Sequence, residues 1–365
     1  MTVPEIILSG SPRQKGLTHG RLARALVLRS LETYRMRFAR SKGFSWEDAR
    51  AVARDFAPTL VGPFAPYAEE MQGIADGAGL EFEDVLAMNL RSEILYSGLQ
   101  RPETGSLAEC SAFAATPPAT AGGAVLAGQT WDYTRAQREA TFLARFPKEG
   151  DRPAMWMPME GGMVGGKGVN AAGISLTLNA LSSPRTGMGI PLHVRMRRIL
   201  EARTFEKAIQ HAFEPPVAGP ACLIITSADG RCSGFELDPD GTAVLYPKRG
   251  ILVHTNHFIS SRYRLAESDL PGGSTVPRLQ RLSALLHGTT AISESDAETF
   301  LRDHENAPFS ICAHPAPDTP PERFSEVSAT NYAFVVNLSR GRLRFVMGNP
   351  CEGEFRTLLD QKRSS

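Results

Sequence analysis

The chain lacks a run of apolar residues long enough to cross a bilayer, which takes about 20 consecutive apolar residues. Its first residues, MTVPEIILSGSPRQKG, contain a short apolar stretch with no basic region ahead of it. Such a start is typical of a first strand and not of a secretory signal. We therefore expect a cytoplasmic protein with no membrane partner.

The sequence also lacks an excess of either charge. Its 40 Lys and Arg residues against 39 Asp and Glu leave a formal net charge of +1, and no segment concentrates basic side chains. A surface that follows phosphates needs such a concentration, so nucleic acid is not an expected partner. A chain of 365 residues with 42% hydrophobic residues can bury a large core, in one layered domain or two smaller ones.

Cysteine is scarce, and its number is odd. The five cysteines are widely spaced, which makes a disulfide framework improbable in a chain without an export signal. Each of them is expected to be either a small core residue or a reactive thiol. They are Cys110, Cys222, Cys232, Cys312 and Cys351.

The order of periodic segments predicts an α+β fold. Apolar spacing predicts helices within residues 17–38 and 69–95, whereas residues 100–108, QRPETGSLA, have the composition of an exposed linker. Short strand-like runs dominate after residue 110, and helical stretches interrupt them. We expect a mostly helical segment, 1–109, and a sheet-rich segment, 110–365, which together form one domain.

The segment 109–133, ECSAFAATPPATAGGAVLAGQTWDY, predicts a hairpin with PPATAGG as its connection. A turn centred near Ala121 pairs Asp132 with Cys110 across the ladder. Cleavage before Cys110 would create an α-amino group, with a reference pKa of about 7.7 to 8.0, which can take the thiol proton. The spacing fits equally well an ordinary strand cysteine beside a carboxylate at a strand end.

The strings ECSAFAAT and GQTWDY resemble the nucleophile region of the acyl-coenzyme A:6-aminopenicillanic acid acyltransferase family, the cysteine branch of the N-terminal-nucleophile hydrolases. Further strings resemble this family in order along nearly the whole chain. They are GSPRQKGLTHGRL, EEMQGIADGAGLEFEDVLAMNLRSEI, GKGVNAAGISLTLNAL, GIPLHVRMRRILEARTFEKAI, LVHTNHF and FVMGNPCEGEF.

This resemblance implies a four-layer αββα sandwich, made as a precursor that cuts itself between Glu109 and Cys110. It also implies three catalytic residues. Cys110 matches the nucleophile, Asp132 matches the residue that holds the new α-amino group, and Asn256 matches the side chain that steadies the tetrahedral intermediate. One donor of the last kind is worth roughly 2.7 to 4 kcal/mol in other enzymes.

Five further residues are expected to bind substrate or to support the site: Arg91, Glu93, Trp131, Tyr133 and His257. Arg91 and Glu93 could form an ion pair near the pocket or a solvated pair at a helix end. The chain departs from the family at Ala313, where members commonly carry Arg, and AGPACLI lacks the Ser and Asn of the family string. A penicillin-like substrate is therefore not assumed.

The resemblance predicts an amidohydrolase or acyltransferase that acts on a small N-acyl compound. An acyl-thioester on Cys110 would be resolved by water or by an amine. No cofactor is expected, with a coenzyme A thioester as an alternative acyl donor. The expected partners are the substrate, the chain's own cleaved N-terminal fragment in an α/β heterodimer, and further copies in a homo-oligomer.

Two other readings compete with this one. A non-catalytic protein that binds small molecules could use the same scaffold. A metal site could involve His254, His257, Cys222 and Cys232, but these residues lack the tight pairs of zinc motifs, so no metal is expected. The glycine-rich segment 161–168, GGMVGGKG, lacks the spacing of a phosphate loop and predicts a close-packed turn.

Overall fold

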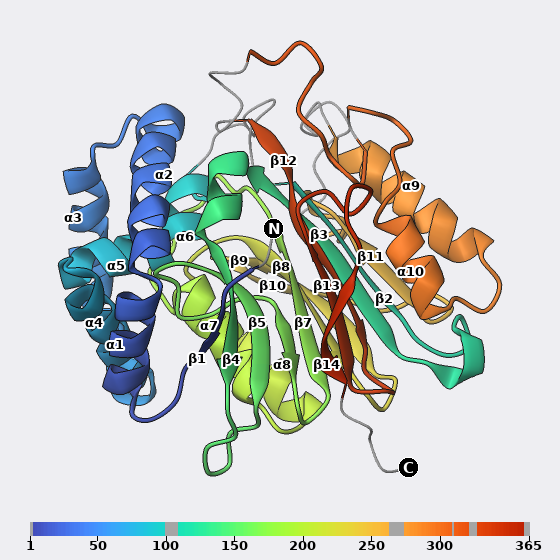
Figure 1. Ribbon diagram of the computed structural model, residues 1–365, viewed down its shortest axis with the longest axis horizontal. Helices are drawn as coiled ribbons and strands as arrows, with labels where there is room; N and C mark the ends of the chain where they lie inside the picture. Colours follow the sequence, from blue (N-terminus) through green and yellow to red (C-terminus); the bar gives the residue numbers. More distant parts are fainter. Residues whose placement is uncertain (1–2, 99–108, 263–273, 309, 321–326, 361–365) are drawn as a thin grey trace.

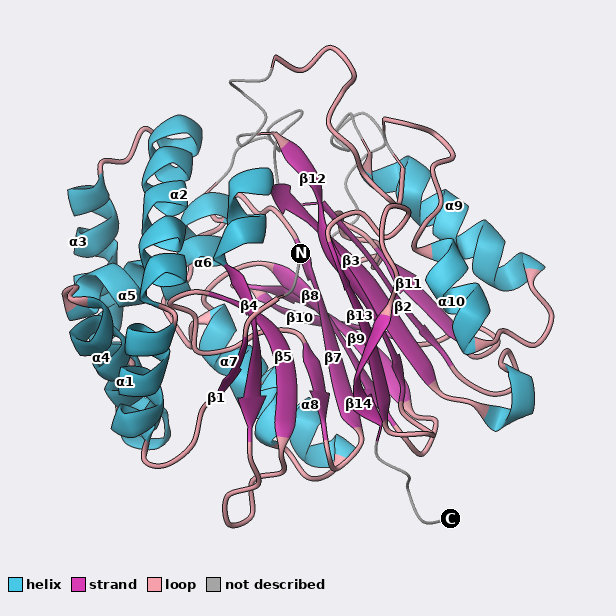
Figure 2. Ribbon diagram, viewed as in Figure 1, coloured by secondary structure: helices cyan, strands magenta, loops and turns pink. Residues whose placement is uncertain are grey.

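The computed structural model describes residues 3–98, 109–262, 274–308, 310–320 and 327–360. Two β-sheets pack face to face, and helices cover their outer faces (Figures 1 and 2). The architecture is an α+β sandwich of four layers, which confirms the predicted fold class. The predicted linker, 100–108, lies outside the described residues.

The first sheet has eight strands in the order β1-β4-β5-β6-β7-β8-β9-β10. Its neighbours are antiparallel, except that β1 runs parallel to β4. The strands are β1 (Glu5–Ile7), β4 (Thr141–Phe146), β5 (Met155–Glu160), β6 (Gly168–Asn170), β7 (Ile174–Ala180), β8 (Ala221–Ser227), β9 (Cys232–Asp238) and β10 (Gly241–Leu245).

The second sheet has six strands in the order β11-β2-β3-β12-β13-β14, and all of its neighbours are antiparallel. The predicted hairpin forms its centre. The strands are β11 (Ile251–His254), β2 (Glu109–Ala115), β3 (Leu126–Thr134), β12 (Ser328–Asn337), β13 (Arg342–Met347) and β14 (Arg356–Asp360).

Six α-helices precede the hairpin among the described residues, and they form the blue and cyan layer in Figure 1. Helices α7 and α8 pack on β6 to β8 of the first sheet, and α9 and α10 cover the second sheet. The α-helices are α1 (Pro12–Leu22), α2 (Arg24–Lys42), α3 (Trp46–Phe56), α4 (Ala65–Ala78), α5 (Phe82–Asn89), α6 (Arg91–Tyr96), α7 (Leu192–Glu201), α8 (Phe205–Phe213), α9 (Thr275–Gly288) and α10 (Glu294–Phe300). The 3-10 helices are η1 (Ala57–Thr59), η2 (Gly62–Phe64), η3 (Ala121–Gly123) and η4 (Arg135–Ala140).

The sheets are joined across their interface by polar as well as apolar contacts. Gln129 of β3 donates to the backbone carbonyl of Leu178 in β7 and accepts from its N–H at 2.9 Å. Gln129 and Leu178 are both buried, so the Gln129 amide satisfies the N–H and C=O of Leu178 where water cannot reach them. The sheet interface is thereby fixed in position as well as packed.

Helices α1 and α4 approach closely through facing glycines. A Cβ atom added at Gly16 would lie 2.0 Å from the Glu70 carbonyl oxygen, and one at Gly20 would lie 2.4 Å from that of Ile74. Gly73 faces α1 in the same way. Since real Cβ atoms do not approach other atoms so closely, the two helices can pack at this distance only with glycine.

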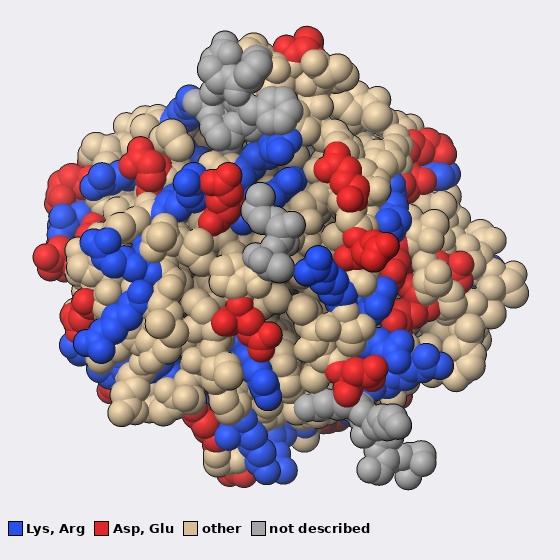
Figure 3. Space-filling model, viewed as in Figure 1, with Lys and Arg blue, Asp and Glu red and all other residues tan. Residues whose placement is uncertain are grey.

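The helix predicted within 17–38 is two helices, because the chain leaves helical geometry at Ala23, where φ is −102° and ψ is 20°. None of the described helices combines the length and apolar character needed to cross a membrane. Acidic and basic side chains alternate over the face shown in Figure 3, in line with the balanced charge.

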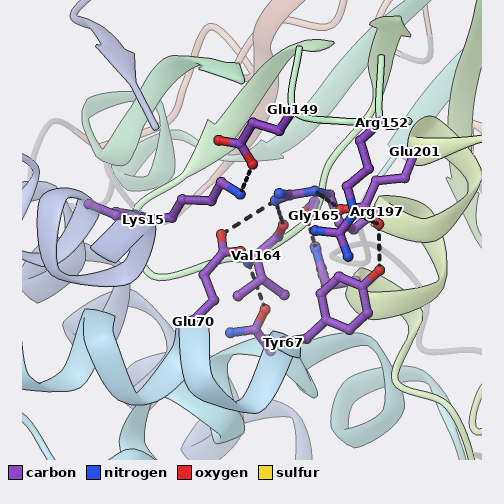
Figure 4. Close-up of polar contacts among 12 residues, drawn as sticks. Lys15, Tyr67, Glu70, Glu149, Arg152, Val164, Gly165, Arg197 and Glu201 are labelled. Atoms are coloured by element: carbon purple, nitrogen blue, oxygen red, sulfur yellow. Dashed lines mark hydrogen bonds and ion pairs between the residues drawn. The ribbon is translucent and has the colours of Figure 1, made fainter. Parts of the chain in front are cut away.

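A buried ion network ties the helical layer to the first sheet and α7 (Figure 4). Arg197 of α7 donates to Glu70 of α4 at 3.3 Å, to Glu201 at 3.0 Å and to the Val164 carbonyl at 3.0 Å. Tyr67 of α4 donates to the other oxygen of Glu201 at 2.7 Å. The guanidinium therefore has partners on both sides of the layer boundary, which a buried charge requires.

Candidate active site

Cys110 lies at the start of β2, between the edge strand β11 and β3 in the second sheet, and it is 3% exposed. It pairs with Trp131 of β3, and Glu109 pairs with Asp132. The predicted pairing of Cys110 with Asp132 is therefore wrong by one residue. Because side chains alternate along a strand, Cys110 shares a face with Trp131 and Asp132 points to the other face.

Asp132 is fully buried on that outer face of the sheet. Its carboxylate accepts a hydrogen bond from the Thr330 hydroxyl at 2.6 Å, and Thr330 in turn accepts from the Ala313 N–H at 2.9 Å. Asp132 still acts on Cys110 through its charge and through its backbone. The sheet thus separates the Asp132 carboxylate from the thiol.

Side chains from other elements hold both polar groups of the Cys110 backbone. Its N–H donates to Asn256 Oδ1 at 2.7 Å. Its carbonyl oxygen accepts from Asn179 Nδ2 at 2.9 Å and from Arg278 Nη1 at 2.7 Å. Asn256 follows β11, Asn179 lies in β7 and Arg278 in α9, so three separate elements converge on one residue.

Arg278 is the centre of this arrangement. Its side chain is 1% exposed, and Nη2 donates to Asn256 Oδ1 at 3.0 Å while Nη1 also reaches Ser111 Oγ at 3.1 Å. Asn256 donates through Nδ2 to the Ala180 carbonyl at 3.0 Å. The amide oxygen of Asn256 therefore faces Cys110, and its side-chain nitrogen faces the first sheet.

Lys167 supplies a buried amine next to the thiol. It lies in the turn between β5 and β6, 3% exposed, with Nζ 4.5 Å from the centre of the Trp131 ring. Burial lowers the pKa of Lys167 to about 8. Burial also raises the pKa of Cys110 to about 11, with Lys167 opposing that rise. The site therefore holds a neutral thiol near an amine that loses its proton at about pH 8.

The glycine-rich turn that carries Lys167 is close-packed, in line with the prediction for 161–168. A Cβ atom added at Gly165 would lie 2.0 Å from the His193 carbonyl oxygen. The Gly162 N–H donates to His19 Nε2 of α1 at 3.0 Å. These contacts fix the turn between α1, α7 and the first sheet, and so fix Lys167.

Arg91 and Glu93 are both buried and take different partners. Arg91 donates to Glu160 at 2.9 Å, and Glu93 accepts from the Leu192 N–H at 2.6 Å at the start of α7. Neither expected arrangement, a mutual ion pair or a solvated pair, is found. Burial raises the pKa of Glu93 to about 7.

The aromatic residues and the histidines of the expected site have structural partners. Trp131 stacks on Tyr133 with ring centres 5.3 Å apart, and the guanidinium of Arg91 lies 5.4 Å from the centre of the Tyr133 ring. His257 shares a hydrogen bond of 2.8 Å with Thr275, whereas His254 pairs with Glu236 at 3.0 Å. The two histidines serve different groups, which argues against the metal site weighed for them.

Sequence reasoning missed three residues of this site: Asn179, Lys167 and Arg278. Arg278 carries the clearest signal, since a charge in the amphipathic helix α9 is buried with Leu282 and Leu286. Lys167 lies in the glycine-rich turn of residues 161–168, whose spacing indicates close packing but no buried amine. Asn179 has no signal beyond a polar residue at the end of an apolar strand.

Comparisons with known proteins find an acyltransferase and two amide-cleaving enzymes that are similar to the chain. It is 25% identical over 309 residues, 84% of each chain, to the 40 kDa form of acyl-coenzyme A:6-aminopenicillanic-acid acyltransferase from Emericella nidulans. Two solved structures are also similar. The N-acylethanolamine-hydrolyzing acid amidase ortholog of Caenorhabditis elegans has a TM-score of 0.45 and 16% identity, over 63% of this chain and 93% of that one. Penicillin V acylase of Agrobacterium tumefaciens has a TM-score of 0.46 and 14% identity, over 65% and 83%.

The family itself is shown by its sequence model. The model described as acyl-coenzyme A:6-aminopenicillanic acid acyl-transferase matches residues 119–352, a span that includes Asp132 and Asn256 and begins after Cys110. This span is more than half of the chain, and it confirms the resemblance found in the sequence. The chain belongs to the acyl-coenzyme A:6-aminopenicillanic acid acyltransferase family.

Proposed function

We propose that this protein is a self-processing amidohydrolase or acyltransferase in which Cys110 is the nucleophile. The observation that carries the proposal is the set of hydrogen bonds from side chains to the Cys110 backbone. Side chains of Asn256, Asn179 and Arg278 hold both of its polar groups. These side chains come from separate elements and would hold the Cys110 sulfur in place beside the Glu109 carbonyl, as attack on that carbonyl requires.

Processing begins with attack of the Cys110 sulfur on the carbonyl carbon of Glu109. A C–S bond forms, the C–N bond to Cys110 breaks, and the nitrogen gains the proton that the thiol has lost. Water then cleaves the thioester to give a carboxylate at Glu109 and a free thiol and α-amine at Cys110. Lys167 is the proposed base for the first proton transfer, because its buried amine has a pKa of about 8.

In the processed enzyme the new α-amine takes over as the base. Its reference pKa is about 7.7 to 8.0. Asn256 Oδ1, which accepts from the Cys110 nitrogen at 2.7 Å before the cut, is placed to accept from the amine after it. The proposed contribution of Asp132 is electrostatic, since its carboxylate lies on the other face of the sheet, bound to Thr330.

The substrate class follows from this chemistry. Attack of the thiolate on a small N-acyl amide releases the amine, which takes up the proton, and leaves an acyl-thioester on Cys110. Water gives hydrolysis and an amine gives acyl transfer, and a coenzyme A thioester is the alternative acyl donor. The Emericella nidulans relative carries acyltransferase in its name and so supports this class.

The two fragments are proposed to remain together as a heterodimer. Strand β1 and helices α1 to α6 belong to the first fragment, and β1 forms part of the first sheet through its pairing with β4. The buried network around Arg197 crosses the same boundary. Both features support a stable pair of chains after the cut.

Denaturing intact mass of the purified protein tests the proposal. Wild type should separate into fragments of about 12 and 28 kDa, from 109 and 256 residues at the chain's mean residue mass. Cys110→Ala should stay whole and inactive against a panel of N-acyl amides and thioesters. Cys232→Ala, a buried cysteine of β9, is the matched control and should cut normally. An uncut, unmodified bond between Glu109 and Cys110 in active wild type would contradict the proposal.

A further inference from the structure

Four side chains with metal-binding atoms gather at the end of the second sheet, away from Cys110. They are His304, Cys312, His314 and Cys351. We propose that these residues bind one zinc ion. Each offers one donor atom, two imidazole nitrogens and two sulfurs, and all four atoms lie within 4.8 Å of one another. Two thiolates and two imidazoles are the ligand set of many structural zinc sites.

Four of the six separations between the donor atoms lie near the edges of a tetrahedron around zinc, and the two between His304 and the sulfurs are within 4.8 Å. With Zn–S at about 2.3 Å and Zn–N at about 2.0 to 2.1 Å, tetrahedral edges are about 3.8 Å for S–S, about 3.6 Å for S–N and about 3.4 Å for N–N. The two sulfurs lie 3.6 Å apart, and the two Nε2 atoms lie 3.1 Å apart. His314 Nε2 lies 3.6 Å from the Cys312 sulfur and 3.2 Å from that of Cys351.

The surroundings orient these ligands as a metal site requires. Glu352 lies 3.7 Å from Nδ1 of His314, the nitrogen that faces away from the cluster. A carboxylate behind a liganding histidine fixes the ring and its tautomer. Asn349 donates to the Ala313 carbonyl at 2.7 Å and lies 3.6 Å from the Cys312 sulfur. Both neighbours hold residues 312–314 against the turn that follows β13.

Exposure leaves a route for the ion. Cys312 is buried and His314 half-buried, while His304 and Cys351 are exposed. Zinc can therefore enter from the surface side and close the site over Cys312. The ligands lie 2, 10 and 37 residues from His314 along the chain, so the sequence shows no paired zinc motif. The proposal departs from the expectation of no metal.

The ion would have a structural role that reaches the proposed active site. The backbone N–H of Ala313, between two ligands, donates to Thr330, and Thr330 donates to Asp132 at 2.6 Å. Zinc would fix the loop that places this hydroxyl. It would also keep Cys312 and Cys351 from forming a disulfide with each other.

The test measures metal in the Cys110→Ala chain, so its result does not depend on self-cleavage. Protein purified with reducing agent and without chelator should hold one zinc per chain by elemental analysis and native mass. Cys351→Ser and His304→Ala, both at exposed positions, should reduce the content at least tenfold. Cys232→Ser and His287→Ala are matched controls and should retain it. The protein loaded with cobalt in place of zinc should show the absorption of a tetrahedral thiolate site. Both ligand variants should lose this absorption.

Three results would overturn the proposal. The first is apo-protein that takes up less than about a tenth of an equivalent of zinc from an equimolar supply, or that holds iron instead. The second is an equal zinc content in wild type, Cys351→Ser and His304→Ala. The third is a mass lower by two hydrogens in folded protein that was kept under reducing agent. That mass would show that the two cysteines form a disulfide.

Discussion

Burial reverses the order of the pKa values of Lys167 and Cys110, which start at 10.5 and 9.0. The amine falls to about 8 and the thiol rises to about 11, so both groups are neutral just above pH 8. An ammonium cannot accept a proton, and an amine can. A buried lysine of this kind is suited to act as a base near neutral pH.

The rate of self-cleavage should therefore rise with pH and level off above about pH 8, where Lys167 has lost its proton. Lys167→Met should slow cleavage by about 10² to 10⁴-fold, the usual contribution of a general base, and remove this step in the pH profile. Cell-free synthesis at set pH, followed by denaturing gels over time, measures the rate. Lys207→Met, an exposed lysine of α8, is the control. Unchanged rates in Lys167→Met would exclude the base role.

Arg278 combines several contacts that a lysine cannot reproduce. Its planar group reaches Cys110, Ser111 and Asn256 together, whereas an ammonium is a single point of charge. Arg278→Lys should slow cleavage by about tenfold or more, the equivalent of one charged hydrogen bond. Arg281→Lys, in the same helix and paired with Asp303 near the surface, should cut at the wild-type rate. Equal rates in both variants would show that Arg278 does not position Cys110.

At the scale of elements, the close packing of α1 against α4 depends on the glycines where the two helices meet. Gly20→Ala should lower the free energy of unfolding of the Cys110→Ala chain by about 1 to 3 kcal/mol, because the new Cβ meets the Ile74 carbonyl. Gly288→Ala, at the end of α9 with no atom within 4 Å of its Cβ position, should not lower it. Denaturant unfolding measures both, and an equal effect would contradict the close approach.

The sequence predicts the hairpin of β2 and β3, but its register is wrong by one residue. Register is specified where one face of a strand is apolar and the other polar. All nine residues of β3 are buried, so the alternation that would fix the register is absent. This one residue decides that Asp132 points away from the thiol of Cys110.

The parts of the site differ in how far the sequence reveals them. Cys110 and Asn256 were found through family strings, and the structure brings Asn256 Oδ1 to 2.7 Å from the Cys110 nitrogen. Arg278 lies 168 residues from Cys110 and meets it because α9 packs on β2. A contact made by packing of distant elements has no local pattern, so neither Arg278 nor Asn179 was predicted. The roles of Cys110, Asp132 and Asn256 remain predictions.

At the scale of the whole molecule, two buried histidines couple stability to pH. Burial lowers the pKa values of His19 and His193 to about 3, from 6.5. Between these values the unfolded chain binds protons that the folded chain does not. Their contribution to stability is complete above pH 6.5 and is lost progressively as the pH falls toward 3.

Between pH 7 and pH 5 these two histidines should therefore lower the free energy of unfolding of the Cys110→Ala chain, while Glu93, whose pKa is raised to about 7, acts in the opposite direction. His19→Gln keeps an acceptor for the Gly162 N–H and should flatten this dependence. The same substitution at His287, exposed at the end of α9, should leave the slope unchanged. Denaturant titrations at each pH supply the values, and equal slopes in all three chains would contradict the assignment.

Strand β1 lies before the proposed cut and β4 after it, yet the two pair within one sheet. An uncut chain can reform that sheet in a first-order reaction, at a rate independent of concentration. Once cut, the molecule can do so only by an encounter of two pieces, whose rate falls with dilution. Heat inactivation of the processed enzyme should thus be practically irreversible in dilute solution. After the cut, unfolding would no longer be reversible in practice. The lifetime of the active form would then be set by its rate of unfolding.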